Sequence, residues 1–153
     1  MKFVRAVSHL SVILALSLLG TAAEQRDSGL SSLPAAAQSA VSAQAVVDHV
    51  RKQLIGVLGL RDCRFEYGIL IGHPPRLEQD GTIVTRYGHI DVELAGMPAE
   101  EVELRTFGNG QYYGRFMVTP TPGSKPTRQA RLVAVTLADL AGRALGSAVS
   151  SRA

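Results

Sequence analysis

The sequence has no tryptophan, a single cysteine and few aromatic residues, which make up 5% of its 153 residues. A core with so few large rings must be built mainly from leucine, valine, isoleucine and alanine. Because Cys63 is the only cysteine, an intrachain disulfide and a metal cage of cysteines are both excluded. Its neighbours alternate in polarity, so we expect a small buried hydrophobic residue; a reactive thiol or an intermolecular disulfide is the alternative.

The chain also lacks a tract of basic residues, although it carries 16 lysines and arginines against 13 acidic residues. Its arginines stand singly among acidic residues, whereas nucleic-acid-binding proteins usually gather them into a stripe. We therefore expect no nucleic-acid partner. The composition, 46% hydrophobic and 19% charged, is typical of one globular domain.

The first 23 residues have the layout of a secretory signal. Lys2 and Arg5 precede a mostly apolar run over residues 6–19, and Thr21 and Ala23 are the small residues before a cleavage site. The run is shorter than the roughly 20 apolar residues of a membrane-spanning helix. A signal or anchor segment is predicted for residues 1–23, with a cytosolic amphipathic or linker helix as the alternative. Residues 24–42, rich in serine and alanine, are predicted to form a linker that becomes helical toward its end.

Two amphipathic helices are predicted at the ends of a folded domain that covers residues 43–150. Apolar residues recur at helical spacing over residues 44–58, and Gly59 is a plausible stop. In the closing helix, Ser124 or Thr127 can cap the start. The helix has an apolar stripe, which consists of Ala130, Val133, Leu137, Leu140 and Leu145.

Between the helices, segments with period two predict about five strands. Asp80-Gly81 and Asn109-Gly110 are turn pairs that predict hairpins, and "HIDVEL" (residues 89–94) reads as a strand with Ile90, Val92 and Leu94 inward. Strands joined by hairpins pair antiparallel. The predicted fold is therefore α+β, an antiparallel sheet of about five strands with the N- and C-terminal helices packed on one face.

The segment "YYGRFMVTPTPG", followed by a polar stretch and the helix "ARLVAVTLADLAGRALGSA", is similar to the C-terminal half of a GAF domain. The opening helix and "RDCRFEY" are similar to the first helix and strand of that family. The likeness covers about residues 46–149 and is to the GAF-like region that follows the membrane domain in actinobacterial sensor proteins. It implies a non-enzymatic regulatory module that binds a small ligand, or that pairs through its terminal helices with a second copy or a signalling partner.

The candidates for a ligand pocket are Phe65, Tyr112, Gly114 and Phe116. Arg115 and Met117 could line the same cavity, since pockets are usually apolar with a few polar anchors. Gly114 has no side chain, so either backbone or ligand can approach it closely. The alternative is that these residues form ordinary core. No cofactor is expected.

His89, Asp91 and Glu93 form the one cluster with metal-ligand chemistry, and period two would place them on one strand face. Because their Cβ atoms would then lie about 6.5–7 Å apart, a single metal would suit them poorly, and a solvated strand face is the preferred interpretation. His73 could act as a general base, but no nucleophile accompanies it, so a histidine in a surface turn is preferred. We expect neither a metal site nor an enzyme.

An alternative of a different class is a small exported α+β protein, binding or structural, whose likeness to GAF domains is only architectural. The signal layout favours export or membrane anchoring, whereas the family likeness implies the cytoplasm. The location therefore stays open between the two.

The N-terminus of the mature protein tests the predicted signal. If residues 1–23 are removed on export, mass spectrometry of the culture medium will find a protein that starts at Glu24. Intact protein starting at Met1 inside the cell would contradict export and favour the regulator.

Overall fold

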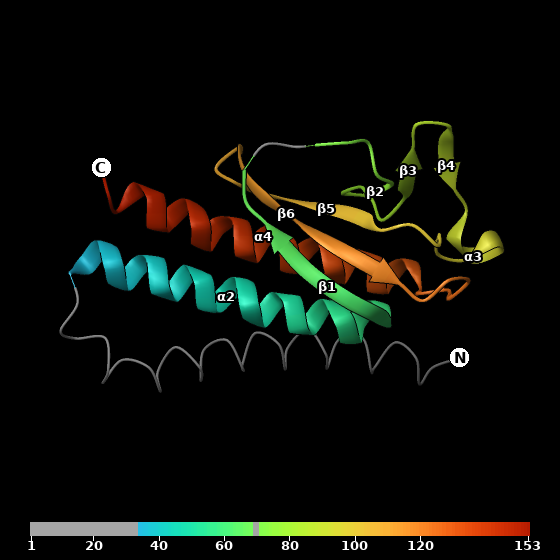
Figure 1. Cartoon of the computed structure of the whole chain (residues 1–153), viewed down its shortest axis with the longest axis horizontal. Coiled ribbons are helices and arrows are strands. Elements are labelled where there is room, and N and C mark those ends of the chain that lie inside the picture. The colour runs from blue at the N-terminus through green and yellow to red at the C-terminus, as the bar shows by residue number, and fades with distance from the viewer. Residues whose placement is uncertain (1–33, 69–70) are drawn as a thin grey trace.

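Two long antiparallel helices lie beneath a twisted sheet in the computed structural model (Figure 1), which describes residues 34–68 and 71–153. The predicted signal segment and residues 24–33 of the predicted linker lie outside the described residues. In chain order the elements are α2 (Ala35–Leu58), β1 (Leu60–Glu66), β2 (Arg76–Leu77), β3 (Ile83–Thr85), β4 (Gly88–Ile90), α3 (Val92–Ala95), β5 (Val102–Gly108), β6 (Gln111–Pro120) and α4 (Arg128–Ser150).

The signals predicted for the helix ends are confirmed. Gly59 ends α2 in the left-handed region, with φ 63° and ψ 45°. Thr127, one of the two predicted caps, begins α4, and its hydroxyl accepts from the Ala130 N–H at 3.1 Å. However, α2 starts at Ala35, inside the predicted linker. Alanine is the strongest helix former, so this alanine-rich stretch continues the helix.

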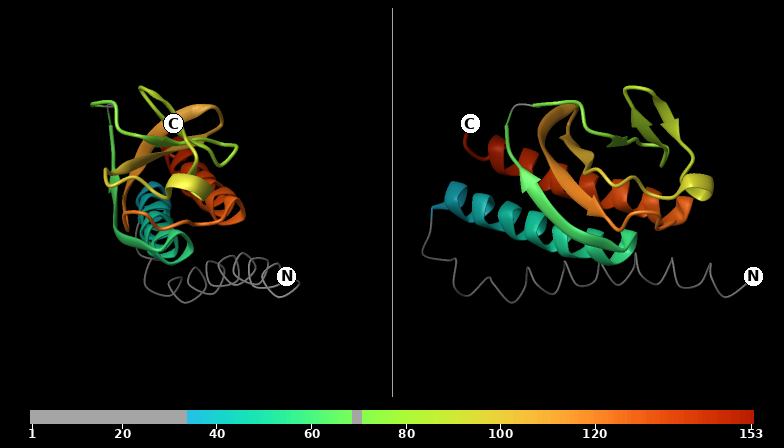
Figure 2. Two further views of the ribbon diagram at one scale, coloured as in Figure 1. Left: turned by 90° about the vertical axis from the view of Figure 1, so that its right-hand side faces the viewer. Right: turned by 45° about the vertical axis from the view of Figure 1, so that its right-hand side comes forward.

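The sheet has six strands in the order β1-β6-β5-β2-β3-β4. The α+β class is confirmed, and Figure 2 shows both long helices on the same side of the sheet. The prediction of a purely antiparallel sheet is wrong, because β2 pairs with β5 in parallel, with Arg76 opposite Glu103. The chain between them forms β3, β4 and α3, which is long enough to bring β5 back in the direction of β2.

Both predicted hairpins form. β2 and β3 pair antiparallel around Asp80-Gly81, and β5 and β6 pair antiparallel around Asn109-Gly110. Asn109 (φ 52°) and Gly110 (φ 77°) both have the positive φ that a tight two-residue turn requires. The hairpin of β5 and β6 supplies the second and third strands of the sheet, which lie between β1 and β2.

The strand predicted over residues 89–94 is wrong beyond Ile90, where β4 ends. Asp91 instead caps α3, and its carboxylate accepts from the Leu94 N–H at 3.1 Å. Aspartate is among the preferred helix caps, and this local bond outweighs the alternating pattern. As a result Val92 is buried, whereas Leu94 is 78% exposed and does not point inward as predicted.

The buried side of α4 consists mainly of small residues. Of the predicted stripe, Leu137 is buried and Val133, Leu140 and Leu145 are partly buried. The closest approach to the sheet is made by glycine: a Cβ on Gly142 would lie 2.6 Å from the carbonyl carbon of Phe107. By length and composition α4 is the one helix of the described residues that could cross a membrane, but 44% of that apolar window is buried inside the fold.

Gly142→Ala should therefore destabilise the protein. The added methyl group would overlap the β5 backbone, and overpacking of this kind costs about 1–3 kcal/mol. Urea denaturation of the described domain, residues 34–153, measures the change in the free energy of unfolding.

The matched control is Gly56→Ala, in α2, where an added Cβ meets nothing within 4 Å. This variant should be more stable than the wild type by up to about 1 kcal/mol, because alanine is the better helix former. Equal effects of the two substitutions would contradict the close contact between α4 and β5.

Candidate functional site

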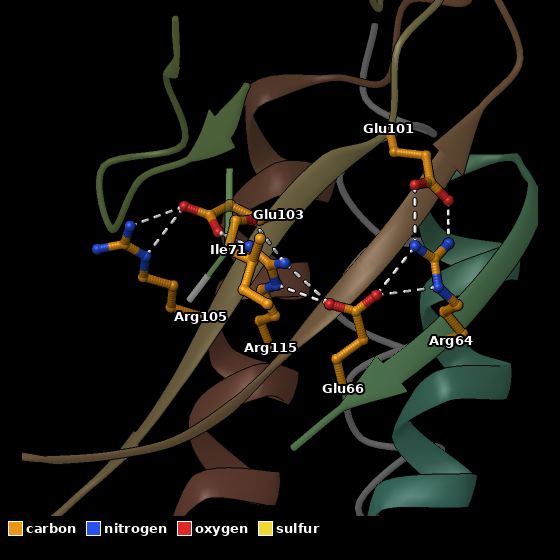
Figure 3. A network of polar contacts seen from close by, with 7 residues as sticks. All are labelled: Arg64, Glu66, Ile71, Glu101, Glu103, Arg105 and Arg115. Carbon is orange, nitrogen blue, oxygen red and sulfur yellow. Dashed lines mark hydrogen bonds and ion pairs between the residues drawn. The ribbon is translucent and has the colours of Figure 1, made fainter. Parts of the chain in front are cut away.

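The sheet face turned away from α2 and α4 carries a ladder of alternating charges (Figure 3). Strands β1, β5 and β6 supply arginines and glutamates at alternate positions, and Glu101 precedes β5. We call this set the charged ladder, and it consists of Arg64, Glu66, Glu101, Glu103, Arg105 and Arg115. It contains three cations and three anions, so the ladder is electrically balanced.

Arg115 lies at the centre of the ladder, and its side chain is only 8% exposed. Its guanidinium donates to Glu66 Oε2 at 2.9 Å, to Glu103 Oε2 at 2.8 Å and to the carbonyl oxygen of Ile71 at 3.1 Å. The other oxygen of Glu103 accepts from Arg105 Nε at 3.0 Å. Buried charges are tolerated when they are paired and hydrogen-bonded, and both central groups meet that condition.

The ladder keeps its outer carboxylates ionised. Partial burial opposes ionisation of Glu66, but hydrogen bonds from Arg115 and Arg64 outweigh it and hold its pKa below the ordinary value. The hydrogen bonds from Arg64 likewise lower the pKa of Glu101. Burial lowers the pKa of Arg115, yet its bonds to Glu103 and Glu66 outweigh this effect and raise the pKa. The ladder is thus a fixed network of charges at neutral pH.

A half-open cleft of about 590 Å³ lies over this face, and we call it the outer cleft. The strands contribute Arg64, Thr85, Ile90, Arg115 and Met117 to it. The residues of the loops and turns around it are Ile71, Gly72, His73, Pro74, Pro75, Arg86, Tyr87, Pro98, Glu100 and Glu101. The hydrogen bond from Arg115 to Ile71 ties the first of these loops to the sheet.

Three of the predicted pocket residues come together on the opposite, helix-facing side of the sheet. The rings of Phe65 and Phe116 meet edge to face at 4.8 Å, and a Cβ on Gly114 would lie 2.6 Å from the Phe65 ring. Tyr112 lies near the hairpin turn, with its ring 5.9 Å from Phe107. None of the four residues lines the outer cleft, and their role in ligand binding stays a prediction. Arg115 and Met117, which were expected to line the same cavity as the four, do line the outer cleft.

The three residues considered as metal ligands do not share a strand face, so the solvated strand face preferred for them is wrong as well. His89 lies in β4, Asp91 caps α3, and Glu93 accepts from the buried Arg131 at 2.9 Å. The common face is lost because the strand ends at Ile90. Within residues 34–68 and 71–153, no group of three or more histidine, cysteine, aspartate or glutamate side chains could hold a metal ion.

Cys63 is buried, as expected for a small hydrophobic residue. Burial raises the pKa of its thiol to about 12, so the reactive thiolate form is strongly disfavoured at neutral pH. His73 lies in the exposed segment before the two prolines and lines the outer cleft. The predicted surface exposure of this histidine is therefore confirmed, but it follows the bend at Gly72 and does not itself lie in a turn.

The sequence does contain a signal for the charged ladder. Arg64-x-Glu66 and Glu103-x-Arg105 each place opposite charges two residues apart on a strand, where both side chains share one face. Arg76-x-Glu78 repeats the spacing from β2 to the residue that follows it. Repetition of this pattern indicates one charged sheet face. Arg86 and Tyr87 belong to the turn between β3 and β4, and no comparable pattern marks them.

Comparison of the chain with protein-family models, with curated proteins and with solved structures finds no match. The outer cleft is therefore the feature from which a function can be inferred.

Glu103→Gln should strongly destabilise the protein. It removes the charge that is shared by Arg105 and Arg115, and loss of one partner from a buried ion pair typically costs about 3–5 kcal/mol. Chemical denaturation at neutral pH measures the change in the free energy of unfolding.

Glu78→Gln is the matched control, because Glu78 also pairs with an arginine two residues away on a neighbouring strand. The side chains of Arg76 and Glu78 are each 33% exposed, so we expect Glu78→Gln to lower the free energy of unfolding by less than about 1 kcal/mol. A similar small cost for Glu103→Gln would show that the buried pair does not hold the outer face together.

Proposed function

We propose that this chain is a non-enzymatic regulatory module that binds a small ligand in the outer cleft. The observation that carries the proposal is a cleft of about 590 Å³ above a sheet face whose charged groups are already fixed by one another. Sites for small molecules are usually clefts of roughly 300–1,000 Å³ that exist before the ligand arrives.

The lining of the outer cleft favours binding over catalysis. Its residues include no serine and no cysteine, and the hydroxyl of Thr85 is engaged as a donor to the carbonyl oxygen of Gly88 at 3.0 Å. Covalent catalysis needs a nucleophile within hydrogen-bond reach of a base. The carboxylate of Glu101 is held by Arg64, so it is poorly placed to act as a free base.

The rim of the cleft exposes two large hydrophobic side chains. Ile71 is 79% exposed and Tyr87 is 84% exposed, and both line the cleft. With Ile90, Pro98 and Met117 they provide apolar surface beside the polar ladder. Exposed apolar residues gathered around a cleft favour a role in binding, because a ligand would remove them from water.

The fold offers a physical route from the outer cleft to the helices. Arg115 and Met117 reach the cleft from β6, which pairs along its length with β5. At the end of β5, Gly108 contacts the backbone of Gly142 in α4. A ligand that shifts β6 would therefore act on α4, and we propose that α2 and α4 present the surface for a second copy or a signalling partner.

Ligand binding can be followed at the methionine methyl groups. Met117 lines the outer cleft and Met97 does not, although both side chains are equally buried at 4% exposure. In protein labelled with ¹³C at the methionine methyl groups, compounds that bind should shift the Met117 signal and leave that of Met97 in place. Nucleotides, haem and small metabolites form the first set to be screened.

Failure would take either of two forms. Compounds that raise the melting temperature without moving the Met117 methyl signal would place the ligand elsewhere. A screen in which no compound binds would remove the ligand-binding role and leave only an interaction role for the helices.

A further inference from the structure

A smaller cleft of about 210 Å³ adjoins the outer cleft, and we call it the side cleft. The two clefts share five lining residues, which come from the segment before β2, from the end of β3 and from the turn after it. These residues form a wall between the two cavities. The shared residues are Gly72, His73, Pro74, Thr85 and Arg86. The side cleft is completed by Arg76, Val84, Glu103 and Arg105.

The wall between the two clefts is held in place by the sheet. The carbonyl oxygen of Pro75 accepts from the Glu103 N–H at 2.8 Å, and the successive prolines Pro74 and Pro75 restrict the backbone before β2. On the other side, the Tyr87 N–H donates to Thr85 Oγ1 at 3.0 Å. Both segments that carry shared residues are thus positioned before any ligand is present.

The side cleft has an excess of positive charge. Three arginines line it, together with the single carboxylate of Glu103. Arg76 is paired with Glu78, and Arg105 is paired with Glu103. Arg86 has no carboxylate partner among the described residues, and its guanidinium stacks over the Tyr87 ring, 4.7 Å from the centroid.

The unpaired positive charge of Arg86 lies where the two clefts meet. Since the ladder is balanced and Arg76 is paired, two charged lining residues are left without an ion-pair partner in the described part of the chain: Arg86 at the shared wall and Glu100 in the outer cleft alone. The other lining carboxylates, Glu100 and Glu101, belong to the outer cleft alone. An anionic group is therefore favoured in the side cleft, and an apolar group over Ile90 and Met117 in the outer cleft.

Resting on the proposed function, we infer that the ligand is a small organic anion that occupies both clefts. Its apolar body lies in the outer cleft, and its carboxylate or phosphate group enters the side cleft and binds Arg86. The planar guanidinium of arginine presents several donors that match either anion. Arg76 and Arg105 add positive charge from the strands, and His73 supplies a further polar group at the wall.

The test uses pairs of compounds that differ in the anionic group. Benzoate with benzamide, indole-3-acetate with indole-3-acetamide, and adenosine 5′-monophosphate with adenosine are titrated by calorimetry into the full-length protein. The acid of at least one pair should bind about tenfold or more tightly than its neutral partner, because a hydrogen bond to a charged group contributes that much. The Met117 methyl signal reports whether each compound reaches the outer cleft.

Arg86→Ala should abolish the preference for the acid. The matched control is Arg143→Ala, which removes the same charge from an exposed position on α4 that lines neither cleft. The control should keep the wild-type preference.

The outcomes separate the inference from the function on which it rests. Neutral compounds that bind as tightly as their acids and shift the Met117 signal would overturn the anion inference and keep the ligand-binding role. Acids whose affinity is unchanged by Arg86→Ala would overturn the assigned position of the anion. If no compound binds, the inference falls together with the ligand-binding role.

Discussion

Glu103 accepts hydrogen bonds from two arginines on two neighbouring strands, and the outer face of the sheet depends on this sharing. Arg105 and Arg115 lie directly opposite each other in the pairing of β5 with β6, where like charges are destabilising. The backbone N–H of Glu103 also donates to Pro75, next to the parallel pairing with β2. One residue thus links the charged ladder, the only parallel strand pair of the described sheet and a wall of the outer cleft.

Local signals in the sequence were enough to predict the C-terminal end of α2, the start of α4 and the main hairpin. A helix stop at Gly59, a helix cap at Thr127 and a tight turn at Asn109-Gly110 each depend on the backbone of a few adjacent residues. They can therefore be predicted without knowledge of the rest of the fold. Strand order is different, because the β2–β5 pairing joins segments that are far apart in the chain. Asp91 shows a third case, in which strand alternation and a helix cap compete and the local hydrogen bond prevails.

The candidate site was only partly predictable because both faces of the central strands are buried. Leu104 and Phe116 are buried toward the helices, while Glu103 and Met117 are buried on the opposite face. Period two separates these two sets, but the prediction took the aromatic rings and Gly114 from the helix-facing set and added Arg115 and Met117 from the opposite face to the same pocket. Arg86 and Tyr87 reach the cleft only because the pairing of β2 with β5 places their turn there.

Strand β1 forms one edge of the sheet, and backbone groups at its middle are already hydrogen-bonded within the chain. The Cys63 N–H donates to the Asp62 carboxylate at 2.8 Å, and the Cys63 carbonyl oxygen accepts from Arg51 of α2 at 3.4 Å. The register also shifts between Leu60 and Asp62. Satisfied backbone groups, charged side chains and an irregular register are the devices by which edge strands avoid pairing with another chain. The β1 border of the sheet is therefore protected at Cys63 against edge-to-edge aggregation.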